Sequence, residues 1–149
     1  MNKKLSKKII ISNKVTSTND IHKILDEIQE ELLLLNISKA ELTVLLTSIS
    51  EVYRLFLNIF KEIHTTISSL ENSQGIGVSF LVKQVKLEGS KTPSTAGSTE
   101  VKKKAESKLT KIKTVYDKFI IESDNDNLIS LTLEKWFNES GIDHYINKN

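Results

Sequence analysis

The chain has 149 residues, of which 38% are hydrophobic and 27% are charged. These values exclude a disordered chain and indicate one packed domain, because a chain of this length buries about two thirds of the surface that its unfolded form exposes. The formal net charge is +2, and Arg54 is the one arginine among 21 basic residues, so the overall charge does not indicate nucleic-acid binding. The chain has no cysteine, which excludes disulfides and thiol nucleophiles.

The N-terminal region predicts a strand followed by a helix. Three consecutive isoleucines, residues 9–11, predict a strand over residues 8–12 with both faces covered. Ser17 has the spacing of a helix cap to Asp20, and apolar residues then recur at helical spacing, which predicts a helix over residues 18–35. The first residues lack the apolar run of a signal peptide, and no apolar stretch is long enough to span a membrane. We therefore expect a cytoplasmic protein without a membrane partner.

A second capping pattern starts the most apolar part of the chain. Ser38 and Glu41 repeat the spacing of the first cap, and an apolar stripe then extends from Leu42 to Ile67. This stripe predicts one long central helix.

The middle of the chain predicts a turn and a strand. Residues 72–75 have turn composition, and residues 76–87 have the Val and Phe content of a strand. We expect Val78, Phe80 and Val82 to share one face of that strand. The strand should pair with others in a sheet.

The C-terminal part predicts a loop, a helix and a closing hairpin. Residues 88–100 are rich in Gly, Ser and Thr, which is typical of a mobile loop. Residues 101–116 predict a third helix with a lysine-rich outer face. Short β patterns at residues 119–122 and 128–137 predict the hairpin, and residues 138–149 predict a C-terminal tail.

These elements indicate one α+β domain over residues 8–137. Their order is β-α-α-β-loop-α-β-β, in which the helices can all lie on one side. We expect a two-layer sandwich of a small mixed sheet with about three helices on one face. Trp136, near the end of the closing strand, is expected to pack on a helix.

Two stretches resemble a known family. Residues 47–54, Thr-Ser-Ile-Ser-Glu-Val-Tyr-Arg, resemble a Ser-Glu-Leu-x-Arg-Asn signature. Residues 113–123, with the strand up to Trp136 after them, are similar to a last helix and closing hairpin that ends in Lys-Trp. Both belong to the RsbT- and RsbW-like anti-sigma and switch serine kinases of the GHKL ATPase superfamily. The resemblance implies a histidine kinase-like ATPase fold.

Three elements of that family's ATP site are missing. Glu51 matches the glutamate that acts as general base, but Leu55 stands where the Mg²⁺-binding asparagine is expected. Residues 83–87 lack the adenine-binding aspartate and the glycines of the first box. Residues 103–108 carry side chains where a second glycine-rich box is expected to open the third helix. The resemblance therefore implies a pseudokinase that has lost ATP and Mg²⁺, with no cofactor or metal and with Glu51 as a vestigial base.

The hypothesis that follows is a non-catalytic regulatory domain that acts by protein–protein interaction. The family's partners imply a STAS-type antagonist domain or a sigma-like factor, and a homodimer stays an open alternative. The candidate partner-binding residues are Glu51, Arg54, Lys103, Lys104 and Lys108.

Two other functions stay open. One is an active serine/threonine kinase with a diverged ATP site. The other is a basic nucleic-acid-binding module on the lysines of residues 102–113, which the neutral overall charge disfavours.

Overall fold

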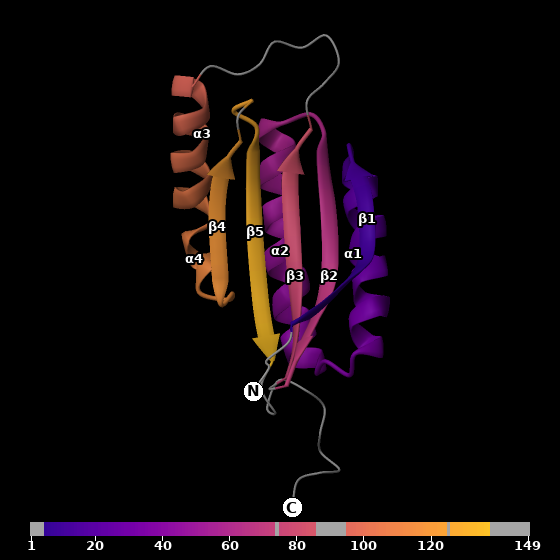
Figure 1. Ribbon diagram of the computed structural model, residues 1–149. Helices are drawn as coiled ribbons and strands as arrows, with labels where there is room; N and C mark the ends of the chain where they lie inside the picture. Colours follow the sequence, from indigo (N-terminus) through magenta and orange to yellow (C-terminus); the bar gives the residue numbers. More distant parts are fainter. Residues whose placement is uncertain (1–4, 74, 86–94, 125, 138–149) are drawn as a thin grey trace, which may run out of the picture.

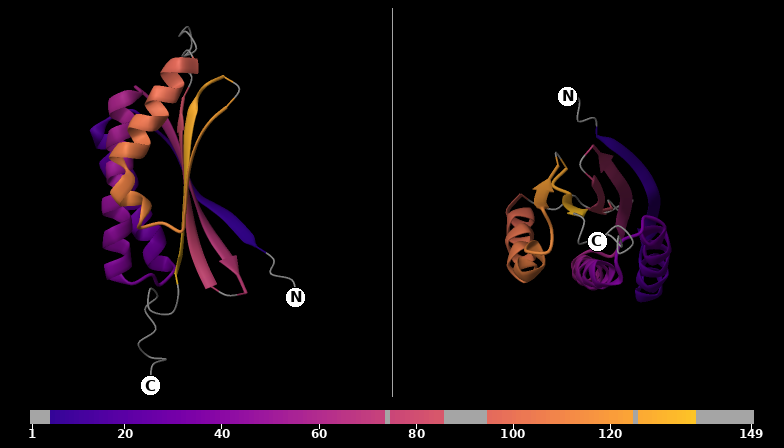
Figure 2. Two further views of the ribbon diagram at one scale, coloured as in Figure 1. Left: turned by 90° about the vertical axis from the view of Figure 1, so that its left-hand side faces the viewer. Right: turned by 90° about the horizontal axis from the view of Figure 1, so that it is seen from below.

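The fold is a two-layer α+β sandwich, described here from a computed structural model over residues 5–73, 75–85, 95–124 and 126–137 (Figure 1). Its elements, in chain order, are β1 (Ser6–Val15), α1 (Thr18–Leu34), α2 (Lys39–Ile59), β2 (Ile63–Asn72), β3 (Gly75–Gln84), α3 (Thr95–Lys108), α4 (Thr110–Lys113), β4 (Lys118–Ser123) and β5 (Ile129–Phe137). The strands form one sheet in the order β1-β2-β3-β5-β4. Figure 2 shows the helices on one face of this sheet, with α2 between α1 and α3. The expected α+β class with helices on one face is thus confirmed.

The first helix begins and packs as its sequence predicts. The Ser17 hydroxyl accepts a hydrogen bond from the backbone N–H of Asp20 at 3.1 Å, which satisfies one of the free N–H groups of the first turn. The buried side chains of α1 recur every three or four residues, so a single apolar stripe faces the sheet. They are Ile21, Ile24, Ile28 and Leu32.

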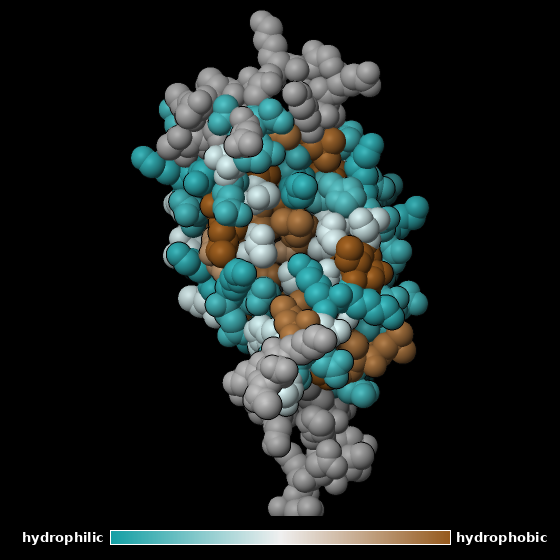
Figure 3. All heavy atoms as spheres, in the orientation of Figure 1, coloured by the Kyte–Doolittle hydropathy of each residue, from teal (hydrophilic) through white to brown (hydrophobic). Residues whose placement is uncertain are grey.

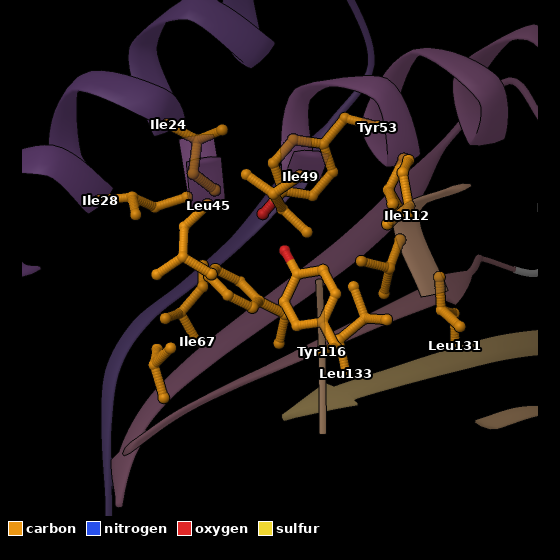
Figure 4. Close-up of a cluster of buried hydrophobic side chains, with 14 of the residues drawn as sticks. Ile24, Ile28, Leu45, Ile49, Tyr53, Ile67, Ile112, Tyr116, Leu131 and Leu133 are labelled. Carbon is orange, nitrogen blue, oxygen red and sulfur yellow. The ribbon is translucent and has the colours of Figure 1, made fainter. Parts of the chain in front are cut away.

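The core lies between the sheet and the helical layer, with α2 at its centre (Figure 4). Phe80 of β3 and Leu133 of β5 face one another across the strand pair, and both are fully buried. Val78 and Val82 lie on the same face of β3 as Phe80, so the predicted apolar face of this strand is confirmed.

The long central helix predicted up to Ile67 is wrong at its C-terminal end. Helix α2 ends at Ile59, and Ile63 to Asn72 form strand β2. Ile63 and Ile67 satisfy helical spacing, but Ile63, Thr65 and Ile67 also alternate with more exposed residues at the period of a strand. This β-branched segment fits a pleated sheet better than a helix.

The first strand lies at the edge of the sheet, so the prediction that both its faces are covered is wrong. Strand β1 pairs with β2 alone, and a bulge interrupts the register between Ile9 and Ile11. Ile11 is buried, whereas Ile9 is 61% exposed.

Other details also differ from the expectation. All strand pairings are antiparallel, so the sheet is not mixed. Helix α3 begins at Thr95, so residues 95–100, expected in the loop, are helical. Residues 86–94 of that loop and the tail at residues 138–149 lie outside the described part of the chain. The closing hairpin is confirmed as β4 and β5.

Helix α2 also has a composition relevant to membranes. Among the described helices it is the one that is long and apolar enough to cross a bilayer, judged by length and composition alone. Its buried side chains, including Leu45, Ile49 and Phe56, belong to the domain core. The core helix of a two-layer domain has this same composition, because one of its faces packs on a sheet.

Candidate partner-binding surface

The predicted site residues lie on two helices of one layer. Glu51 and Arg54 belong to α2, and Lys103, Lys104 and Lys108 belong to α3. All of these side chains are exposed to solvent. The residues thus belong to the surface of the helical layer, which Figure 2 shows on one side of the sheet.

The position of the expected metal ligand is apolar and turned towards the core. The Leu55 side chain is half-buried and packs against the hydrophobic core. Glu51 lies one turn before Leu55 on α2 and Arg54 directly precedes it, and no ion pair joins either charged residue to another described residue. Among the described residues, no three His, Asp or Glu side chains are grouped to hold a metal ion. The Leu55 side chain has no oxygen atom that could bind Mg²⁺.

Residues 103–108, which were predicted to begin the third helix, do not lie at its N-terminus. Lys103 to Lys108 lie in the second half of α3 and do not open it. Backbone N–H groups in that part of a helix are engaged by carbonyl oxygens of the preceding turn and are not free for phosphates. The segment that opens the helix at Thr95 includes Gly97. The side chains at residues 103–108 are therefore no evidence for or against a glycine-rich box.

The lysines of α3 and α4 form an exposed basic strip, which we define as Lys103, Lys104, Lys108, Lys111 and Lys113. Within the described chain, no acidic side chain forms an ion pair with any of them. The Lys113 ammonium group lies 5.8 Å from the centre of the Phe119 ring, at the distance of a cation–π contact. The strip therefore presents five exposed ammonium groups, with the exposed Glu106 among them on α3.

A buried hydrogen bond joins α2 to the segment before β4. The hydroxyl groups of Ser48 and Tyr116 are 2.7 Å apart, and the Ser48 hydroxyl also donates to the Leu45 carbonyl at 3.0 Å. Figure 4 shows Tyr116 pointing from the end of α4 towards α2. Burial raises the pKa of Tyr116 well above its ordinary value, because the charged phenolate would lose its hydration.

Sequence reasoning did not single out this pair. Ser48 and Tyr116 lie in the two stretches that carry the family resemblance, yet they are 68 residues apart. The local signal for this pair is the Ser48 hydroxyl within the apolar stripe of α2, because a buried hydroxyl group needs a hydrogen-bond partner.

A second buried pair fixes α2 to the sheet. The Tyr53 and Thr65 hydroxyls are 2.8 Å apart, and burial likewise raises the pKa of Tyr53. Both tyrosines therefore hold α2 by hydrogen bonds inside an apolar core, in which unpaired hydroxyls would be costly.

Arg54 is the predicted site residue that borders a hollow between α1 and α2. This hollow has a volume of about 500 Å³ and is lined by Thr16, Ser17, Thr18, Ile21, Arg54, Leu57 and Asn58. None of the other four predicted residues lines it. Among the predicted residues, this hollow is therefore bordered by Arg54 alone.

Comparison of the sequence with models of known protein families and with curated proteins finds no match.

Proposed function

We propose that this chain is a non-catalytic regulatory domain that binds another protein through its helical layer. We further propose that it is a degenerate relative of the RsbT- and RsbW-like kinases, with a GHKL-like fold and a STAS-type domain or sigma-like factor as partner. The observation that carries the proposal is the exposure of all five predicted residues on α2 and α3. A catalytic base acts on a substrate held within hydrogen-bond reach, whereas a binding surface needs exposed groups.

The chemistry of α2 supports a non-catalytic role. Glu51 is exposed, and Leu55, one turn further along, packs against the core. A kinase of the resembled family would need an oxygen ligand for Mg²⁺ at Leu55. Without the metal, phosphate charge at this position would lack the cation that neutralises it during transfer.

Nucleotide binding is the first test. Titration calorimetry of the full-length protein with ATP and Mg²⁺ should give no binding heat at micromolar concentrations. Micromolar binding that is lost in Glu51→Ala would favour the alternative of an active kinase. Transfer of labelled phosphate to a candidate partner, abolished by the same substitution, would establish it.

Partner binding is the second test and uses the basic strip. The variant Lys103→Glu/Lys104→Glu/Lys108→Glu should lose the partner, because the three side chains are exposed and form no ion pair within the described chain. The matched control is Lys8→Glu/Lys23→Glu/Lys39→Glu, which reverses three exposed lysines on other elements. Affinity for a purified STAS-type domain or sigma-like factor should fall in the first variant and not in the control.

The basic strip also favours a second candidate function, the binding of nucleic acid. Five lysines without acidic partners on α3 and α4 could contact phosphates in the manner of a sequence-independent binder. Such binding weakens steeply as salt rises, because counterions are released from the nucleic acid. A gel-shift series over increasing salt separates this candidate from protein binding, since binding that is absent or insensitive to salt excludes it.

A further inference from the structure

One face of the sheet has no helix packed on it. Figures 1 and 3 view the molecule from this side, which we call the open face, and Figure 3 shows hydrophilic and hydrophobic side chains mixed on it. Trp136 belongs to this face, so the expectation that it packs on a helix is wrong. It is opposite Gly77, and a β-carbon placed on Gly77 would lie 2.8 Å from the indole ring. The ring therefore lies against the sheet.

A hollow of about 600 Å³ lies on the open face near the C-terminal end of β3. Three residues that line it are neighbours across the strands. Lys83 of β3 is opposite Ser130 of β5, and Ser130 is opposite Glu122 of β4. The short serine side chain between two long charged ones leaves the space above β5 open.

The two sides of the hollow carry opposite charges. Within the described chain, neither Lys83 nor Glu122 forms an ion pair. Lys14, which also lines the hollow, differs from them because its ammonium group is 3.2 Å from the Glu62 carboxylate. The charges left for a ligand are therefore a cation on β3 and an acid on β4.

A second carboxylate is fixed on the acidic side. Asp124 follows Glu122 by two residues and lines the same hollow. Its Oδ1 atom accepts hydrogen bonds from the backbone N–H groups of Asp126 at 2.8 Å and Leu128 at 2.9 Å. These bonds hold the carboxylate in place, so the acidic side of the hollow does not depend on Glu122 alone.

The separation of the opposite charges limits the kind of ligand. Lys83 and Glu122 are two strand spacings apart, which is about 10 Å. A charge-assisted hydrogen bond of about 2.8 Å at each side leaves about 4 Å between the charged atoms of a bridging molecule. The amine nitrogen and the carboxylate oxygens of an α-amino acid are about 3 Å apart. A simple anion would meet the acids, and a simple cation would meet Lys83.

The hollow also offers apolar surface. Leu81, Val85 and Leu128 line it and are half-buried. A few charged groups among apolar ones, in a volume between about 300 and 1,000 Å³, are typical of a small-molecule site. An apolar side chain on the ligand would cover these three residues.

We propose that this hollow binds a free α-amino acid with an apolar side chain. The ligand's carboxylate pairs with Lys83, its ammonium group pairs with Glu122 and Asp124, and it lies over Ser130. The proposal does not depend on the function proposed for the helical layer, which is on the other side of the sheet.

Titration of the full-length, ¹⁵N-labelled protein with L-leucine tests the site by nuclear magnetic resonance. Because the hollow is open to solvent, we expect a dissociation constant of about 1 mM. The backbone amide signals of Lys83, Ser130 and Glu122 should shift and approach saturation.

Two altered ligands separate the charges. L-leucine methyl ester lacks the carboxylate, and N-acetyl-L-leucine lacks the ammonium group. Each should bind about tenfold more weakly than L-leucine, because each leaves one side of the hollow without its ion pair.

Three variants test the protein side. Lys83→Met and Glu122→Gln keep the size of the side chain and remove its charge, so each should weaken L-leucine binding about tenfold. Ser130→Leu fills the space between two intact charges and should abolish binding. The matched controls are Lys8→Met and Glu30→Gln, which remove exposed charges outside the hollow and should bind as the wild type does.

Three results would overturn the proposal. The first is the absence of saturating shifts with L-leucine. The second is an altered ligand that binds as tightly as L-leucine, because the site would then recognise an anion or a cation alone. The third is a set of Lys83→Met, Glu122→Gln and Ser130→Leu variants that bind L-leucine as the two controls do.

Discussion

At the scale of single residues, the Ser48–Tyr116 hydrogen bond gives an asymmetric prediction. Tyr116→Phe leaves Ser48 able to donate to the Leu45 carbonyl, so it should lower the free energy of unfolding by only about 1 kcal/mol. Ser48→Ala leaves the buried Tyr116 hydroxyl without its partner and should cost about 2 kcal/mol. Urea denaturation of the two variants measures the difference.

The double variant is the control for this residue pair. Removing both hydroxyl groups leaves no unpaired Tyr116 hydroxyl, so the combined cost should be clearly smaller than the sum of the single costs. Strictly additive costs would contradict the coupling of Ser48 to Tyr116. The variants should keep the wild-type urea dependence of the unfolding free energy if the native fold is unchanged.

The sequence predicted some residues of the candidate site and could not predict others. The exposed lysines of α3 follow from helical spacing, since Ala105 and Leu109, four residues apart, face the core and leave Lys103, Lys104 and Lys108 on the exposed side. The contact of Ser48 with Tyr116 joins segments far apart in the chain, and no local pattern specifies which distant element a hydroxyl meets.

At the scale of elements, local pattern predicted the helices better than the sheet. Caps at Ser17 and Ser38 correctly begin α1 and α2, because a cap is formed within four residues of chain. Strand β2 was missed because Ile63 and Ile67 fit two periods at once. The edge position of β1 depends on the strand order, which is a property of the whole sheet and not of the isoleucines.

The pairing of β3 with β5 gives the prediction at this scale. A β-carbon on Gly77 would lie 2.9 Å from the Lys135 carbonyl oxygen and 2.8 Å from the Trp136 ring, so Gly77→Ala requires the two strands to shift. We expect a loss of about 1–3 kcal/mol in the free energy of unfolding, as is typical of overpacking. Thermal unfolding followed by the fluorescence of Trp136, the one tryptophan, measures it.

Gly75→Ala is the matched control on the same strand. Its β-carbon would approach only the Phe137 carbonyl oxygen, at 3.2 Å, so its cost should be the smaller of the two. Equal costs would show that a general loss of glycine, and not the contact with Trp136, explains the effect.

At the scale of the whole molecule, α2 is tied to both other parts of the fold. Tyr53 connects it to Thr65 of β2, and Ser48 connects it to Tyr116 before β4. Both bonds are buried, so the helix cannot move away from the sheet without exposing hydroxyl groups and apolar side chains together. The domain is therefore expected to unfold in one cooperative step.

The two tyrosines also make stability depend on pH at the alkaline end. The ordinary pKa of a tyrosine is 10.0, and burial raises the pKa of Tyr53 and of Tyr116 in the folded protein. Below about pH 10 both tyrosines are neutral in the folded and the unfolded chain, so their contribution is fully present. Above about pH 10 only the unfolded chain loses these protons. The free energy of unfolding should then fall by about 1.4 kcal/mol per pH unit for each tyrosine.

Urea denaturation at pH values between about 9 and 11 tests this dependence. Tyr116→Phe removes one of the two groups, so its stability should fall less steeply with pH than that of the wild type. Lysines also lose protons in this range, but they are the same in both proteins, so the difference between the two slopes reports Tyr116 alone. Identical slopes would mean that Tyr116 ionises as readily in the folded chain as in the unfolded one, which a buried phenol bonded to Ser48 does not allow.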